Sequence, residues 1–172
     1  VYFSKKNIKC VGYDINKEKV RKINSGIIPL KDLEKWFGFD IKKIVKKGYL
    51  KATTNSDDLI SEKFIAHFIA VPTEKNGKPY YKPLMSVLSN IAKMRNLNSK
   101  IPPLIIVEST LAPKVSDKKI LPFLKRKKFQ IGKNILFSVA PRRDWFIEGV
   151  KNLENLDRVY GSTDNNSAKV TK

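Results

Sequence analysis

Short apolar runs alternate with helix-like segments along the whole chain, and this alternation most constrains its fold. Apolar runs at 8–13, 64–71 and 103–108 are each followed, after a few polar residues, by a stretch with helical character. Strands that alternate with helices favour a mainly parallel sheet with helices on both faces. We therefore expect an α/β protein of the doubly wound, Rossmann-like type, in which the carboxyl ends of the strands share one edge.

Caps, glycines and prolines predict where the elements begin and end. Asn16 is a suitable N-cap for a helix over Lys17–Asn24, and Gly26 is a suitable stop. Pro122 should kink a helix over Val115–Lys128. The other expected elements are a helix end at 1–6, a helix or helix pair over 31–47, a strand over 50–53, a short helix over 56–61, a polar loop over 74–80, a helix over 84–94, and strands over 135–139 and 158–160. Together they would form one domain over residues 1–172.

Asp14 stands where the first apolar run stops and the next helix begins. Open α/β sheets bind ligands at the carboxyl ends of their strands, and a carboxylate there can accept both hydroxyls of an adenosine ribose. The same carboxylate would repel a 2′-phosphate. Acidic residues are also common in turns, so position alone leaves ribose binding and a turn role equally open.

Two further strand ends carry small polar residues. Ile69–Thr73 ends a strand at Pro72, which cannot donate to a sheet ladder. Ser109-Thr110 follows a buried strand, and its hydroxyls can approach a ligand, hold a water molecule or cap the following helix. His67 lies inside an apolar run and is expected to be a core or hydrogen-bonded histidine. No group of His, Cys and acidic residues has the spacing of a metal site.

In this order and spacing, the motifs resemble those of the nucleotide-sugar 6-dehydrogenases, the UDP-glucose/GDP-mannose dehydrogenase family, and most of all its UDP-N-acetylmannosamine dehydrogenases. The resemblance covers nearly the whole chain and rests on Tyr13-Asp14-Ile15-Asn16 with Lys19, Ile23–Gly26, Lys47–Thr54, Ile69–Thr73, Val107–Thr110 and Arg158–Gly161. It implies an NAD-binding domain and oxidation of the C6 primary alcohol of a UDP-linked sugar to a uronic acid, for polysaccharide biosynthesis. It also implies a homodimer or higher oligomer for the full-length protein.

The resemblance implies roles for individual residues as well. Asp14 and Lys19 would contact the adenosine ribose, which raises the ribose role of Asp14 above the turn role. Thr110 would help to position the catalytic water. The residues implied at the cofactor also include Val71, Pro72, Thr73, Ser109, Thr110 and Glu148.

The chain departs from the family pattern in several places. Arg142 stands where relatives carry a glutamate that assists hydrolysis of the enzyme-bound intermediate, and a guanidinium cannot act as a general base. Glu148 would match a downstream glutamate of some relatives only with two residues inserted. No G-x-G-x-x-G occurs, and the catalytic cysteine of the family lies in a later segment. We therefore expect a chain that is cut at both ends, lacks the first strand and Gly-rich turn, and is inactive alone.

The excess of basic residues keeps other functions open. A formal charge of +19, from 35 basic and 16 acidic residues, attracts polyanions. This charge makes a basic nucleic-acid-binding module one alternative, and Arg142 with the absent Gly-rich turn makes a degenerate, non-catalytic relative another. The clusters Lys42-Lys43, Lys46-Lys47 and Lys125–Lys128 fall on expected helices, where a solvated face is the favoured interpretation, so nucleic acid is a disfavoured partner.

Membrane and secretion signals do not appear in the sequence. The apolar runs are too short to cross a bilayer, and no signal-peptide pattern starts the chain. Cys10 is the single cysteine, so it cannot form an internal disulfide, and we expect it to be a buried structural thiol. A soluble, cytoplasmic protein without a membrane partner is expected.

Overall fold

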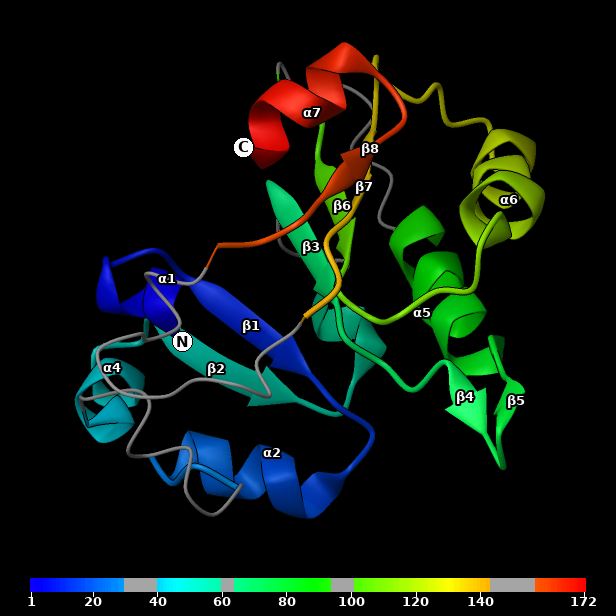
Figure 1. Ribbon diagram of the computed structural model, residues 1–172. Helices are drawn as coiled ribbons and strands as arrows, with labels where there is room; N and C mark the ends of the chain where they lie inside the picture. Colours follow the sequence, from blue (N-terminus) through cyan, green and yellow to red (C-terminus); the bar gives the residue numbers. More distant parts are fainter. Residues whose placement is uncertain (30–39, 60–63, 94–100, 143–156) are drawn as a thin grey trace. The chain divides into compact units, whose positions relative to one another are not determined.

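The computed structural model describes residues 1–29, 40–59, 64–93, 101–142 and 157–172. The described residues up to 59 belong to one compact unit, and those from 64 onward belong to a second. Each unit contains parallel strands and helices (Figure 1).

The first unit is built on a two-stranded parallel sheet. β1 (Cys10–Tyr13) pairs with β2 (Leu50–Thr53), with Gly12 opposite Ala52. The helices of this unit are α1 (Tyr2–Lys5), α2 (Lys17–Asn24), α4 (Ile41–Lys46) and the 3-10 helix η1 (Ser56–Leu59). Ile41, Ile44, Leu50 and Ala52 are its buried apolar residues.

Local hydrogen bonds define the ends of α2 and α4. Asn16 Oδ1 accepts from Lys19 N at 3.0 Å, and Asp40 Oδ1 accepts from Lys42 N at 2.8 Å. After α2, Gly26 takes a φ of 76°, the left-handed conformation that ends many helices. The predicted cap, bounds and stop of α2 are therefore confirmed. Of the helix expected over 31–47, α4 is the described part.

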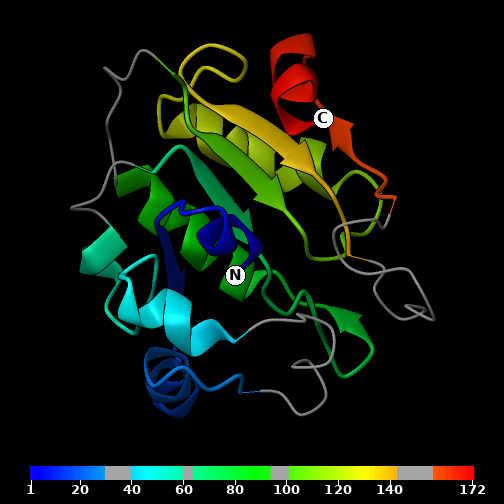
Figure 2. The ribbon, with the colours of Figure 1, turned by 90° about the vertical axis from the view of Figure 1, so that its left-hand side faces the viewer.

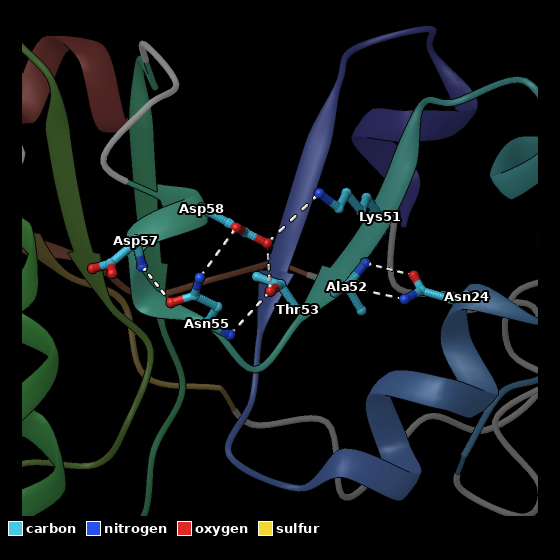
Figure 3. A network of polar contacts seen from close by, with 7 residues as sticks. All are labelled: Asn24, Lys51, Ala52, Thr53, Asn55, Asp57 and Asp58. Carbon is cyan, nitrogen blue, oxygen red and sulfur yellow. Dashed lines mark hydrogen bonds and ion pairs between the residues drawn. The ribbon is translucent and has the colours of Figure 1, made fainter.

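The Asn24 side chain closes the edge of β2 that faces away from β1 (Figure 3). Its Nδ2 donates to Ala52 O at 2.9 Å, and its Oδ1 accepts from Ala52 N at 2.7 Å. These are the bonds that another strand would make, so the amide satisfies a sheet edge. At the end of β2, Thr53 Oγ1 donates to Asp58 Oδ2 at 2.7 Å and accepts from Asn55 N at 3.0 Å. These contacts fix the turn into η1.

The second unit is built on a four-stranded sheet with the order β3-β6-β7-β8. β3 (Ala66–Ile69), β6 (Leu104–Val107) and β7 (Leu136–Val139) are parallel, and β8 (Gly161–Ser162) is antiparallel to β7 (Figure 2). The other elements of this unit are the hairpin of β4 (Glu74–Lys75) and β5 (Lys78–Pro79), α5 (Lys82–Lys93), the π-helical turn η2 (Ser116–Ile120), α6 (Leu121–Arg126) and α7 (Asn165–Thr171).

Helices cover both faces of this sheet (Figure 1). Ile105 and Val107 of β6 pack in one apolar cluster with residues of α5 and α6. The residues just before each of them belong to a second cluster on the opposite face, as alternation along a strand requires. On that face Ser138 Oγ and Thr171 Oγ1 lie 2.6 Å apart and join β7 to α7. The predicted α/β class with helices on both faces is confirmed.

Three local predictions were wrong. The polar loop expected over 74–80 is the β4–β5 hairpin, because Asn76 and Gly77 take φ values of 53° and 72°, as a type I′ turn requires. The strand expected over 158–160 is instead Gly161–Ser162, which pairs with β7. Cys10 is half-buried rather than buried, since it lies on a strand of a two-stranded sheet.

The helix expected over Val115–Lys128 changes its hydrogen-bond pattern beside Pro122, and a kink there stays a prediction. Pro122 stands in the first turn of α6, directly after the π-helical turn of η2. Because η2 runs directly into α6, the missing N–H of Pro122 removes a hydrogen bond to a carbonyl of the preceding turn. The wider turn before it is where the helix changes its hydrogen-bond pattern.

Candidate functional site

Asp14 starts the turn that leads from β1 into α2. Its N donates to Thr53 O at 3.2 Å, and its Oδ1 accepts from Asn16 N at 2.9 Å. Lys19 Nζ lies 3.7 Å from Asp14 Oδ2, with both side chains partly exposed. A carboxylate offers about four acceptor positions, so the turn bond leaves others open to solvent. The turn role and the ribose role predicted for Asp14 are therefore compatible.

In the second unit, hydroxyl groups join the turns that follow β3 and β6. Ser109 Oγ accepts from Val71 N at 2.9 Å and donates to Val71 O at 2.7 Å. Thr73 Oγ1 donates to Thr110 O at 2.6 Å. Because β3 and β6 are parallel neighbours, their carboxyl ends meet at one edge of the sheet. The structure thus brings together Val71, Thr73, Ser109 and Thr110.

The surface of these joined turns is mixed in character. Pro72 and Thr110 are exposed, whereas Val71, Thr73 and Ser109 are half-buried. Apolar side chains beside a few fixed polar groups are typical of a small-molecule site. The hydroxyl of Thr110 can donate to and accept from a water molecule or a ligand.

Glu108 also lies at this edge of the sheet, and the sequence analysis predicted no role for it. Its side chain is 9% exposed, with Oε1 2.9 Å from Arg158 Nη2 and Oε2 3.9 Å from Arg142 Nη1. A buried carboxylate requires such charged partners. Glu108 and Arg158 both belong to motifs that carry the family resemblance, but a pair of residues so far apart in the chain gives no local signal.

Arg142 lies just after β7, beside the end of β6. Its backbone N donates to Glu108 O at 3.1 Å, so the arginine in place of the family glutamate borders the candidate site. Its guanidinium brings a permanent positive charge there. Glu148, the other predicted acidic residue, lies outside the described residues.

His67 is not part of the joined turns. Burial lowers the pKa of His67 to about 4, so its imidazole is neutral near pH 7. The ring contacts Phe64 edge-on, with centroids 5.9 Å apart. The side chain is half-buried, so the prediction of a core or hydrogen-bonded histidine is met only in part.

The described residues contain neither a metal-binding cluster nor a helix that could span a membrane. No three His, Cys, Asp or Glu side chains in these parts of the chain are grouped so that they could hold a metal ion. Likewise, none of the helices that the structure describes combines the length and the apolar character needed to cross a bilayer.

Comparison with known proteins identifies the family. Residues 1–172 match the family model described as UDP-glucose/GDP-mannose dehydrogenase family, NAD binding domain. The UDP-N-acetyl-D-mannosamine dehydrogenase of Methanococcus aeolicus is 30% identical over 168 residues, which cover 95% of this chain and 35% of that protein. The enzyme of the same name from Pyrococcus horikoshii is 31% identical over 120 residues, covering 69% of this chain and 27% of that protein.

Solved structures agree with this result. The UDP-N-acetyl-mannosamine dehydrogenase of Staphylococcus aureus superimposes with a TM-score of 0.78 at 26% identity, over 98% of this chain and 39% of that one. GDP-mannose dehydrogenase from Pseudomonas aeruginosa shows the same fold, with a TM-score of 0.76 at 20% identity, over 99% of this chain and 39% of that one. This chain therefore spans 27% to 39% of the length of these relatives. Because the family model matches every residue, the chain belongs to the UDP-glucose/GDP-mannose dehydrogenase family, as a representative of its NAD-binding domain.

Proposed function

We propose that this chain forms part of the cofactor-binding half of an NAD-dependent nucleotide-sugar 6-dehydrogenase. The whole protein would oxidise the C6 primary alcohol of a UDP-linked sugar to the uronic acid, and would assemble as a homodimer or higher oligomer. The observation that carries the proposal is the pair of joined turns, Val71–Thr73 and Ser109-Thr110, at the carboxyl ends of two parallel strands.

Asp14 and Lys19 would hold the adenosine ribose of NAD. The exposed part of the Asp14 carboxylate can accept both ribose hydroxyls while Asn16 N keeps the other oxygen in place. Lys19, 3.7 Å from that carboxylate, can donate to the same sugar. A 2′-phosphate would meet the negative charge of Asp14, so the site should favour NAD over NADP.

The joined turns of the second unit would form a wall of the nicotinamide end. Val71 and Pro72 offer apolar contact, and Thr73 and Ser109 fix the backbone against which the cofactor would lie. Thr110 would hold the water that hydrolyses the enzyme-bound intermediate, because its side chain is exposed beside this wall. When bound, NAD supplies the hydride acceptor for the oxidation.

A second candidate function is a family member that has lost the dehydrogenase chemistry. Arg142 favours it, because a guanidinium cannot take a proton from that water. Under the leading proposal another base is needed, and Glu148 is the candidate. An active enzyme that loses its hydrolytic step on Glu148→Gln would support the leading proposal, whereas inactivity of the whole protein on several UDP-sugars would favour the second.

This chain alone should bind NAD weakly. In dinucleotide-binding folds, the backbone N–H groups of a Gly-rich turn and the helix after it hold the pyrophosphate, and this sequence contains no G-x-G-x-x-G. Titration calorimetry should therefore give no dissociation constant in the low micromolar range. A low-micromolar value for the chain alone would contradict this expectation.

Asp14→Asn tests the ribose role in a protein that joins this chain to a strand and a G-x-G-x-x-G turn. Loss of charge-assisted hydrogen bonds should weaken NAD binding by roughly tenfold to a hundredfold. The preference for NAD over NADP should fall as well. Asp57→Asn is the matched control, because Asp57 is an exposed acidic residue of the same unit in η1. Equal effects of the two substitutions on NAD affinity would rule out the ribose role.

A further inference from the structure

Glu108 lies at a crossing of three strand ends in the second unit. Its N donates to Ile69 O of β3 at 2.8 Å, and its O accepts from Arg142 N, just after β7, at 3.1 Å. Its carboxylate, 9% exposed, pairs with Arg158 at 2.9 Å, and the same guanidinium nitrogen donates to Ala140 O at 2.9 Å. Glu108 is thus attached to both neighbours of β6 and to the segment before β8.

The turn after Glu108 is held from two sides. On the β3 side, Ser109 bonds to Val71 in both directions and Thr73 bonds to the carbonyl of Thr110. On the β7 side, the contacts come from Glu108 itself. If the carboxylate is released, the turn loses its side-chain attachment on the β7 side and keeps there the backbone bond from Arg142 N to Glu108 O.

We propose that Glu108 is the positioning residue for Ser109 and Thr110, and that Arg158 is its essential partner. The ion pair fixes the direction in which the turn leaves β6, and so fixes where the exposed side chain of Thr110 lies. Arg142, 3.9 Å from the other carboxylate oxygen, brings a second positive charge beside it. This inference rests on the proposed function for its consequence in catalysis, but its geometry can be tested without any cofactor.

The effect of Glu108 on the position of the turn can be distinguished from its effect on the stability of the whole sheet. The Arg158 side chain is 35% exposed, so solvent screens the ion pair and its contribution to the stability of the whole fold is small. Glu108 lies at the end of β6, whereas the apolar cluster around Ile105 lies behind the strand. Neutralising the carboxylate should therefore loosen the turn and leave the centre of the sheet ordered.

The test is backbone order in the isotope-labelled chain, measured by NMR relaxation without ligand. In the native chain the amides of Ser109 and Thr110 should have order parameters of about 0.85, the value typical of rigid backbone. In Glu108→Gln they should fall below about 0.6, while Ile105 and Val107 keep their values. Arg158→Lys keeps the charge without the planar fork, and should produce a smaller decrease at the same two amides.

Glu74→Gln is the matched control, because Glu74 is a carboxylate of the same unit whose Oε1 accepts from Gly77 N within its own hairpin. It should leave Ser109 and Thr110 unchanged. Unchanged order in both Glu108→Gln and Arg158→Lys would overturn the inference, and so would a loss of order spread over the whole sheet. If Glu108→Gln does not fold, the Arg158→Lys result decides. None of these results depends on whether the chain binds NAD, so failure of the proposed function would be seen separately, in the effect of Asp14→Asn on NAD affinity.

Discussion

The surroundings of single residues decide their chemistry at three positions of this chain. Asp14 keeps a partly exposed carboxylate with one oxygen engaged in a turn, which suits a hydroxyl acceptor. The Glu108 carboxylate, by contrast, is only 9% exposed and is paired with Arg158. The sequence predicted a site role for Asp14 from its place after β1. The role of Glu108 depends on its contact with Arg158, and a local sequence pattern does not predict a contact between residues so far apart in the chain. At His67 the loss of contact with solvent alone lowers the pKa of the imidazole.

His67 should make stability depend on pH. Burial lowers the pKa of folded His67 to about 4 from 6.5, so below pH 6.5 the unfolded chain binds a proton that the folded chain excludes. Above pH 6.5 the free energy of unfolding is unaffected by His67. As the pH falls from 6.5 toward about 4, this free energy decreases by at most about 1.4 kcal/mol per pH unit. Urea titrations of the native chain and His67→Gln, at several pH values in this window, should show a shallower slope for the variant. Parallel slopes would contradict the burial of a neutral imidazole.

Elements were predictable where their ends carry local signals. The helix over Lys17–Asn24 has the bounds that its cap Asn16 and its stop Gly26 predicted, because capping depends on residues within one turn of the helix end. The β4–β5 hairpin was also readable in principle from its Asn76-Gly77 turn. The short β8 was not, because a two-residue strand depends on its pairing with β7 rather than on its own residues.

Gly26 and Gly48 form a matched pair for a test at this scale. Both take positive φ, 76° and 75°, so alanine at either position should cost about 1–2 kcal/mol of unfolding free energy. At Gly26 an added Cβ would also lie 2.6 Å from Lys42 Cα of α4, whereas at Gly48 nothing lies within 4 Å. Urea denaturation should therefore show a clearly larger loss for Gly26→Ala. Equal losses would mean that α2 and α4 are not packed as the structure has them.

For the whole molecule, the sequence predicted the α/β class and the family but not the division into units. Alternating strands and helices suggested one continuous sheet, whereas the described strands form a two-stranded parallel sheet, a four-stranded mixed sheet and a small hairpin. β3 shows why: its apolar run is typical of a central strand, yet Phe68 is 45% exposed, since β6 is the single strand paired with β3 among the described residues. Which strands meet depends on the whole chain, and no local pattern records it. The prediction of one domain over residues 1–172 therefore stays a prediction.

The central proposal is that Asp14, in the first unit, contacts the adenosine ribose of NAD, and that the joined turns at Thr73 and Thr110, in the second unit, contact the nicotinamide end. The most direct measurement is NMR shift mapping of the labelled chain with millimolar NAD, repeated with AMP. We expect NAD to shift the amides of Asp14, Lys19, Thr73, Ser109 and Thr110, and AMP to shift only Asp14 and Lys19. Identical maps for the two ligands, or shifts confined to the lysine-rich helices, would contradict the claim.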